Sequence, residues 1–156
     1  FALQAARKTP DIRFVLRLHP VVVYDDLTQK NPELRSIPSN FELSSHSIEQ
    51  DFQRSRWAIY RGSGAGVRAA TAGLRAIYLH NPEDFSPIDP MMELKDWKKE
   101  ISCVADLMPI IADDRTTNWE QLNLEFCSAY DYLSQYFLPL KKDQFFRGLY
   151  AGSPTR

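Results

Sequence analysis

The stretch RWAIYRGSGAGVRAATAGLRAIYL, residues 56–79, predicts the fold of this chain. It begins with a short apolar run, turns through three glycines, and continues with small residues at helical spacing up to Gly73. A second short apolar run follows at 75–79. Two buried strands joined by a helix are typical of a parallel pair, because the crossover helix carries the chain back along the sheet. The stretch therefore predicts an α/β fold.

Two further strands are expected upstream of this stretch. Residues 11–19 alternate apolar with polar side chains and predict a strand that ends at His19 and Pro20. Residues 37–43 include a proline and then Phe-Glu-Leu, which indicates a second, short strand. Strands that alternate with helices favour a parallel sheet covered on both faces.

Helices are expected between these strands. Residues 1–9 read as the end of a helix that the following proline stops. Residues 21–35 predict an irregular turn and then a short helix. Ser47 and Gln50 have the spacing of a capping box, so a helix is expected to start there and to run to about Ser55.

The last third of the chain is predicted to be helical. A proline-rich loop covers 80–90, and helices are expected over 93–147. Two sets of apolar side chains recur there at steps of three or four residues, as on one face of a helix. They are Trp97, Ile101, Val104, Ala105 and Met108, and then Trp119, Leu122, Phe126, Ala129, Tyr130, Leu133 and Phe137. Residues 1–156 are thus expected to form one domain, a Rossmann-like three-layer sandwich with about five or six parallel strands.

The composition is that of an ordinary globular domain. Hydrophobic residues make up 44% of the chain, charged residues 25%, and the formal net charge is −1, which favours neither nucleic acid nor an anionic membrane as a partner. Cys103 and Cys127 lack metal-ligand spacing and are expected to be small buried hydrophobes. No apolar run is long enough for a membrane span, and no signal peptide is evident. A cytoplasmic location is expected, and the first residue, Phe1, indicates a piece of a longer chain.

The turn at 61–66 is the strongest candidate for a binding site. Its glycines allow positive φ and a close approach of a ligand to the backbone. The helix that follows presents unpaired N–H groups and a partial positive charge, which suit a diphosphate. The hydroxyl of Ser63 could cap this helix or donate to a phosphate oxygen. The turn lacks the Lys-Ser/Thr ending of a P-loop, and a tight turn without a ligand is the alternative.

Three basic residues lie at the carboxyl ends of predicted strands and could add positive charge. Arg17 and His19 point to the same face of their strand and could form one anion site, with His19 in general acid–base chemistry. The alternatives are a surface cation paired with an acid and a histidine held in a turn by Pro20. Arg61, at the end of the strand before the glycines, could meet a phosphate.

Two serines and two aspartates are weaker candidates. Ser45 and Ser47 follow a strand and open a helix, where they could contact a nucleotide or cap the helix. Asp84 and Asp89 lie in the proline-rich loop, where they could reach a sugar hydroxyl or form turns. Tyr24-Asp25-Asp26 has no matching ligand cluster, so no metal is expected.

The segment 56–79 resembles the donor site of GT-B glycosyltransferases, above all bacterial capsule and surface-polysaccharide enzymes and the polyglycerol-phosphate transferases of teichoic acid synthesis. The run Arg17-Leu-His-Pro20 is similar to an Arg-x-His-Pro after an early strand of their second domain. The resemblance covers about residues 10–90. One position departs from it, because the glutamate that bonds the donor ribose in many GT-B enzymes is Arg68 here. The matching positions in the donor-site segment are Gly62, Ser63, Gly66, Ala69, Gly73 and the strand 76–79.

The resemblance implies that residues 1–156 are the nucleotide-sugar-binding half of a GT-B enzyme whose N-terminal acceptor domain is absent from this chain. It implies binding of a nucleotide-diphosphate sugar or polyol-phosphate donor in surface polysaccharide biosynthesis, with a glycan acceptor and without a cofactor. The isolated half is expected to be inactive, and attachment of the parent chain to the inner membrane is left open. The implied roles are catalysis by His19, donor binding by Arg17, Ser45, Ser47, Arg61, Gly62, Ser63, Gly64, Ala65, Gly66 and Arg68, and sugar contact by Asp84 and Asp89.

Two rival functions remain open. One is a domain similar to a nucleotide-sugar 2-epimerase, which would need acids and a histidine around C2 and C3 of the sugar. The other is a non-catalytic nucleotide-binding or scaffolding module, which the replacement of the glutamate by Arg68 favours. A test of nucleotide binding by the isolated domain separates the enzymes from the module. Both enzymes are expected to bind a nucleotide, whereas a pure scaffold is not.

Overall fold

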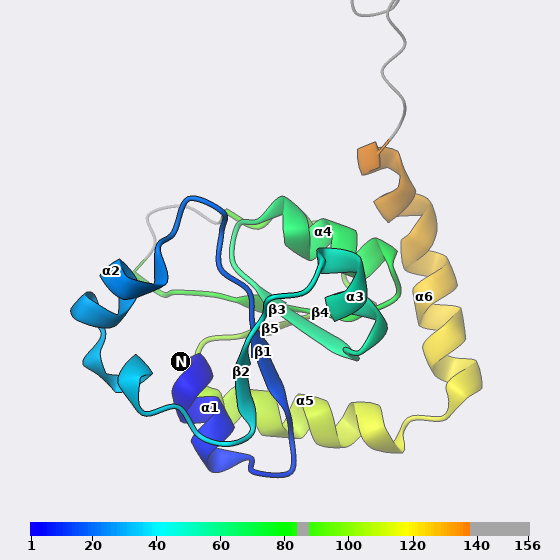
Figure 1. The fold of residues 1–156 in the computed structure, drawn as a ribbon. Coiled ribbons are helices and arrows are strands. Elements are labelled where there is room, and N and C mark those ends of the chain that lie inside the picture. The colour runs from blue at the N-terminus through cyan, green and yellow to red at the C-terminus, as the bar shows by residue number, and fades with distance from the viewer. Residues whose placement is uncertain (84–87, 138–156) are drawn as a thin grey trace, which may run out of the picture.

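A computed structural model of the chain describes residues 1–83 and 88–137. They form a mixed α/β protein (Figure 1). Its strands are β1 (Phe14–Leu16), β2 (Phe41–Leu43), β3 (Trp57–Tyr60), β4 (Arg75–Leu79) and β5 (Lys98–Ile101). Its helices are α1 (Ala2–Lys8), α2 (Tyr24–Lys30), α3 (Ile48–Gln53), α4 (Gly64–Thr71), α5 (Val104–Thr116) and α6 (Trp119–Ser134), with short 3₁₀ helices η1 (Pro32–Arg35) and η2 (Gln135–Phe137).

The strands are parallel, as the sequence predicts, but they form two small sheets in place of one sheet of five or six strands. In the first sheet, β1 pairs with β2, and Phe14 lies opposite Phe41. In the second, β4 lies between β3 and β5, with Ala76 between Ala58 and Lys98. The side chain of Asn40 connects the start of β2 to the chain before β1, since its Nδ2 group donates to the carbonyls of Ala6, Thr9 and Ile12 at 2.8–2.9 Å.

Strand β4 is the centre of the hydrophobic core. Ala76 and Tyr78 belong to one buried cluster, which includes residues of α4 and α6. Ile77 belongs to a second cluster, which includes residues of α1 and α5. Side chains alternate between the two faces of a strand, so helices cover β4 on both faces, and Figure 1 shows α4 and α6 on one side and α1 and α5 on the other. Complete burial of Ile77 contributes roughly 1.5–3 kcal/mol.

A strand replaces a predicted helix at the start of the last third of the chain. Trp97 and Ile101 have helical spacing in the sequence, but residues 98–101 pair with β4 as β5. Helix α5 begins after them at Val104, where the carboxylate of Asp106 accepts bonds from the N–H groups of Ser102 and Cys103. The helical prediction over 93–147 is therefore wrong at 93–103 and correct for α5 and α6, and residues 138–147 lie outside the described part of the chain.

The two cysteines are exposed, contrary to the prediction that they are buried. Cys103 directly precedes α5, and its backbone N–H bonds to Asp106. Cys127 lies on α6, which buries Ala129 and Leu133 instead. The helical period places Cys127 away from these positions, which explains its exposure.

The amino ends of β3 and β4 are held by a buried ion pair. Arg75 is 3% exposed, its Nε atom donates to Oδ1 of Asp114 at 2.9 Å, and its Nη2 atom forms an ion pair with the same oxygen at 2.8 Å. The other oxygen of Asp114 accepts from Nε1 of Trp57 at 2.8 Å. The Arg75 guanidinium lies 4.6 Å from the ring centre of Trp97, and its Nη1 atom reaches Glu125 at 2.6 Å. The planar guanidinium thus connects the sheet to α5 and α6.

No helix within the described ranges is both long and apolar enough to cross a membrane.

Candidate functional site

The turn between β3 and α4 requires glycine at two positions for different reasons. Gly62 has a φ of +59°, and a Cβ there would lie 2.7 Å from Cδ1 of Ile88. At Gly66 a Cβ would lie 2.4 Å from Cγ of Tyr60, so only glycine lets α4 approach the last residue of β3 this closely. Both glycines are therefore explained by the packing of the turn itself.

Gly64 is different, because neither packing nor backbone conformation explains it. Its φ is not positive, and a Cβ built on it would have no atom of the described residues within 4 Å. It is the first residue of α4 and is exposed at the carboxyl end of β3. In parallel α/β sheets this end of the strands is where ligands bind. The backbone at Gly64 is therefore open to a group that approaches the start of α4.

Ser63 caps α4, which was one of its two predicted roles. Its Oγ accepts from the N–H of Ala65 at 3.1 Å, and its carbonyl accepts from the N–H of Gly66 at 2.9 Å. Two N–H groups that the sequence suggests as phosphate donors are thus bonded to Ser63 in this structure. A phosphate would have to replace these bonds or bind at Gly64. Arg61 is exposed at the same turn.

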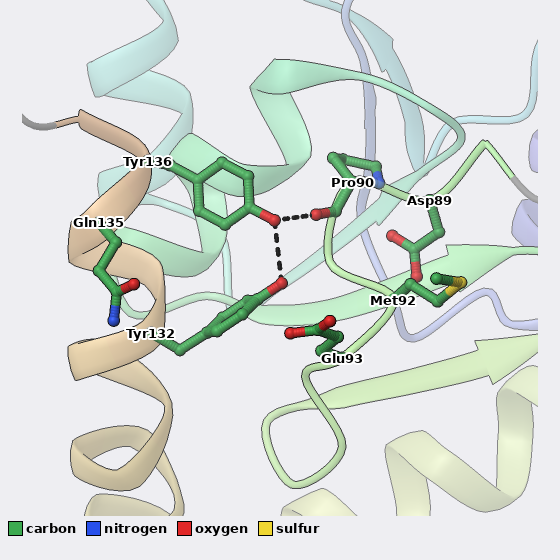
Figure 2. A pocket seen from close by; sticks show the side chains of 7 residues that line it. All are labelled: Asp89, Pro90, Met92, Glu93, Tyr132, Gln135 and Tyr136. Atoms are coloured by element: carbon green, nitrogen blue, oxygen red, sulfur yellow. Dashed lines mark hydrogen bonds between the residues drawn. The ribbon is translucent and has the colours of Figure 1, made fainter.

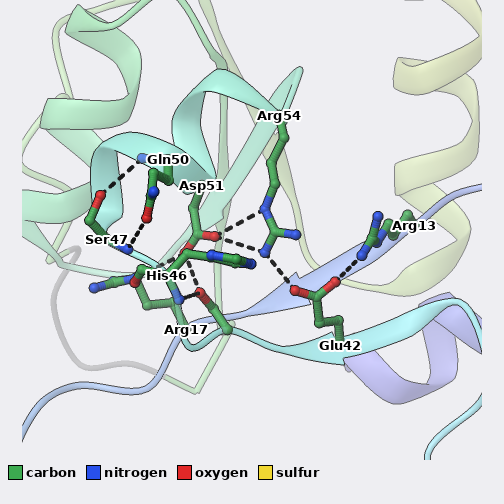
Figure 3. Close-up of polar contacts among 9 residues, drawn as sticks. Arg13, Arg17, Glu42, His46, Ser47, Gln50, Asp51 and Arg54 are labelled. Atoms are coloured by element: carbon green, nitrogen blue, oxygen red, sulfur yellow. Dashed lines mark hydrogen bonds and ion pairs between the residues drawn. The ribbon is translucent and has the colours of Figure 1, made fainter.

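Arg17 lies at the carboxyl end of β1 and is held by an acid (Figure 3). Its Nη1 atom is 2.9 Å from Oδ2 of Asp51 and donates to the carbonyl of His46 at 2.7 Å. Ser44, which follows β2, donates its hydroxyl to the same carboxylate oxygen at 2.5 Å. The predicted alternative of a cation paired with an acid describes Arg17, and its side chain keeps 41% exposure.

Asp51 organises this cluster, and the sequence prediction missed it. Burial acts most strongly on its carboxyl and raises its pKa, but hydrogen bonds from Ser44, Arg54 and Arg17 outweigh burial and leave the pKa below its usual value. Arg54 also bonds to Glu42 of β2 at 2.7 Å, so one arginine connects α3 to the first sheet. The sequence did contain a signal for a buried acid. Asp51 lies three residues after Ile48, and this spacing puts both side chains on the same face of the helix.

The remaining basic candidates and serines do not converge on the turn. His19 is exposed, and its Nδ1 atom lies 3.4 Å from the backbone nitrogen of Val21, as in a turn. Ser47 forms the predicted capping box with Gln50, whereas Ser45 is exposed in the preceding loop. Arg68 projects from α4 to α3, where its Nη2 atom is 2.6 Å from Oε1 of Glu49.

Asp89, a predicted sugar contact, is buried in an ion pair and borders a pocket at the end of α6. Its side chain is 2% exposed and lies 2.5 Å from Nζ of Lys98, which is 4% exposed. Its other oxygen accepts from the hydroxyl of Tyr60 at 2.7 Å. Burial and the bond to Asp89 raise the pKa of Tyr60, so this phenol stays protonated. Asp84, the other predicted sugar contact, lies outside the described residues.

A phenol without a partner lies beside this pair. The rings of Tyr60 and Tyr78 are 5.6 Å apart, and Lys98 Nζ lies 5.9 Å from the Tyr78 ring centre. Tyr78 is 2% exposed, and its hydroxyl is the one buried side-chain polar atom without a hydrogen bond among the described residues. Such a group costs free energy because it loses water without gaining a partner.

The described part of the chain contains two pockets that residues of the glycine turn do not line. One, of about 440 Å³, lies between the loop at 89–93 and the end of α6. The other, of about 520 Å³, lies at the amino end of the strands beside Arg75 and Trp119. Residues 61–65 of the turn are exposed. Within 1–83 and 88–137, no group of three or more His, Cys, Asp or Glu residues is placed to hold a metal.

Comparison of the chain with protein-family models, with curated proteins and with solved structures gives no match in any of the three. Function is therefore inferred from the geometry of the site.

Proposed function

We propose that this domain binds the diphosphate of a nucleotide-activated donor at the start of α4, as one half of a GT-B type glycosyltransferase. The observation that carries the proposal is Gly64, whose backbone is exposed at the carboxyl end of β3 and whose missing side chain is not required by packing. The start of a helix offers N–H donors and a partial positive charge to a phosphate. A side chain at this position would stand where the phosphate approaches.

The neighbouring residues supply the chemistry that transfer of the donor group requires. As the bond to the diphosphate breaks, negative charge grows on the leaving group, and fixed donors lower the barrier by stabilising it. The hydroxyl of Ser63 and the N–H of Gly64 would be these donors, with Arg61 beside them. His19 remains the proposed catalytic group, and a glycan acceptor would come from the absent half.

The proposal extends to the architecture of the parent protein. We propose that the two parallel sheets are parts of one sheet in a three-layer sandwich, which would align the carboxyl ends of β1 and β3 at one edge. Both candidate cations, Arg17 and Arg61, follow directly after those strands. The exposed turn would then close against the other half of the enzyme.

A non-catalytic module is the second candidate, and one observation favours it. Arg17 and Arg68 are each paired with an acid, Asp51 and Glu49, at 2.9 and 2.6 Å. These pairs reduce the positive charge available to a phosphate. In this case the fold would serve binding or scaffolding without transfer chemistry.

The test is nucleotide binding by the wild-type domain and by Gly64→Leu. Calorimetry or ligand-observed NMR with UDP, CDP, GDP, ADP and CMP is expected to show saturable binding of one nucleotide at millimolar concentration or better. Gly64→Leu is expected to weaken this binding at least about tenfold while the fold is retained, because the new side chain meets open space. The matched control is Ala72→Leu, an exposed position at the other end of α4, which is expected to bind as the wild type.

Two outcomes would count against the proposal. Equal binding by Gly64→Leu and the wild type would place the nucleotide elsewhere on the domain. No binding of any of the five nucleotides at about 10 mM would favour the scaffolding module instead.

A further inference from the structure

The pocket at the end of α6 has a chemical character unlike that of the glycine turn (Figure 2). We name it the tyrosine pocket. Its volume is about 440 Å³, which is large enough for a small organic ligand. Among the described residues seven line it, and none of the seven carries a positive charge. They are Asp89, Pro90, Met92, Glu93, Tyr132, Gln135 and Tyr136.

Two tyrosines form one wall of the tyrosine pocket. Tyr132 and Tyr136 lie one helical turn apart, and their rings meet edge to face with centres 5.6 Å apart. The two hydroxyl oxygens are 2.9 Å apart, and the Tyr136 hydroxyl donates to the carbonyl of Pro90. Because each phenol has one proton and that of Tyr136 is used, Tyr132 must be the donor between them. Neither phenol has a proton left for a ligand, and Tyr132 O remains an acceptor.

Carboxylates complete the acceptor surface. Figure 2 shows the Glu93 carboxylate beside Tyr132, and Glu93 is exposed. Burial and the contact with Tyr136 raise the pKa of Tyr132 to about 12, and the charges of Glu93 and Asp89 add to this rise. Tyr132 is therefore protonated at neutral pH, and Glu93 supplies the charge of the pocket because Lys98 already neutralises Asp89.

This arrangement selects among ligand classes. Acceptor oxygens require a ligand that supplies hydrogen-bond donors, and the negative charge of Glu93 favours a cation over a neutral polyol. Aromatic faces add attraction for a cation within about 6 Å. A phosphate or carboxylate is repelled at the same place, so the pocket is no second site for the nucleotide.

We propose that the tyrosine pocket binds a ligand through a protonated primary amine, with Glu93 and the oxygen of Tyr132 as its acceptors. The ammonium group would lie between the Glu93 carboxylate and the tyrosine wall. Its carbon chain would contact Met92 and the aromatic rings. This site is separate from the glycine turn and does not depend on nucleotide binding there.

The test compares benzylamine with benzyl alcohol, which has nearly the same shape but no charge. Backbone amide shifts in ¹H–¹⁵N spectra of the full chain are expected to move at 89–93 and 132–136 with benzylamine and to saturate. Benzyl alcohol is expected to bind at least about fivefold more weakly, because it lacks the charge-assisted bond. Glu93→Gln is expected to remove this preference for the amine, and Tyr132→Phe, which keeps the ring, to weaken amine binding.

The matched control is Glu120→Gln, an exposed acid in the first turn of α6 and absent from the pocket lining. It changes the net charge equally and is expected to bind benzylamine as the wild type does. The proposal is overturned if Glu93→Gln binds the amine as tightly as the wild type, if the alcohol binds equally well, or if no shift saturates below about 50 mM. Each variant's amide dispersion shows whether it is folded, and nucleotide titration of Glu93→Gln keeps this result distinct from the proposed function.

Discussion

At the scale of single residues, the three glycines of the turn have three different explanations. Gly62 needs its positive φ, and Gly66 needs the contact with Tyr60. Gly64 needs neither, and this difference becomes visible only when the space around each position is known. The sequence pattern alone predicts a phosphate site for all three, whereas in the structure only Gly64 has no explanation in packing or backbone conformation.

Two neighbouring tyrosines provide a test of hydrogen bonding at the same scale. Tyr60→Phe removes a bond to the buried carboxylate of Asp89 and is expected to lower the free energy of unfolding by about 1–2 kcal/mol. Tyr78→Phe removes a hydroxyl that has no partner and is expected to leave this free energy unchanged or to raise it slightly.

The measurement is urea unfolding of both variants and the wild type. The two rings are in contact and the same atom is removed from each, so each variant serves as the control for the other. Equal decreases in the free energy of unfolding for the two variants would mean that the Tyr78 hydroxyl finds a hydrogen-bond partner in solution.

At the scale of elements, caps decide where helices begin. The capping box of Ser47 and Gln50 was predictable because it uses only residues within one helical turn. The cap of α5 uses Asp106, whose carboxylate accepts from the N–H groups of Ser102 and Cys103. It was missed because the preceding residues were assigned to the same helix.

The α5 cap predicts a dependence of stability on pH. Bonds from the N–H groups of Ser102 and Cys103 lower the pKa of Asp106 from 3.8 to about 2. A carboxyl whose pKa is lower in the folded state stabilises the fold above its unfolded pKa, and this contribution is lost as pH falls from about 3.8 to about 2. Asp106→Asn is therefore expected to lower the Tm at pH 6 and to have a smaller effect at pH 2.

Thermal unfolding followed by circular dichroism at both pH values measures this difference. Asp113→Asn, an exposed acid later in α5, is the control and is expected to leave the pH dependence close to that of the wild type. A Tm decrease for Asp106→Asn that is the same at pH 6 and pH 2 would contradict the proposed role of the carboxylate.

At the scale of the whole molecule, one ion pair connects the second sheet with both C-terminal helices. Arg75 and Asp114 are 3% and 4% exposed at their side chains, and Glu125 of α6 bonds to the same guanidinium. Removal of one partner leaves a buried charge without full compensation. We expect Asp114→Asn to lower the free energy of unfolding by about 3 kcal/mol.

The comparison for this prediction is Arg115→Ala, which breaks the exposed pair with Asp11. That pair is screened by water, so little change is expected. Denaturant unfolding of the two variants measures the difference, and a similarly small effect of Asp114→Asn would show that the buried pair contributes no more than an exposed one.

The sequence by itself determined the parallel α/β character, the strands at 57–60 and 75–79, and the helix that begins after Ser47. These features depend on local patterns, namely apolar runs, glycines and caps whose partners lie within a few residues. The predicted GT-B donor site remains a prediction, and its residues divide between the glycine turn and separate ion pairs.

Only the tertiary structure decided the roles of the charged residues and the position of β5. Arg17 meets Asp51 across 34 positions, and Arg75 meets Asp114 across 39, so no local pattern predicts either pair. The spacing of Trp97 and Ile101 fits a helix, but pairing with β4 satisfies the backbone of residues 98–101 as a strand. The tyrosine pocket likewise exists because the end of α6 packs against the loop at 89–93, where Tyr136 meets Pro90 across 46 positions. Packing between distant segments settles these features, because the free energy of burial depends on partners that the local sequence does not contain.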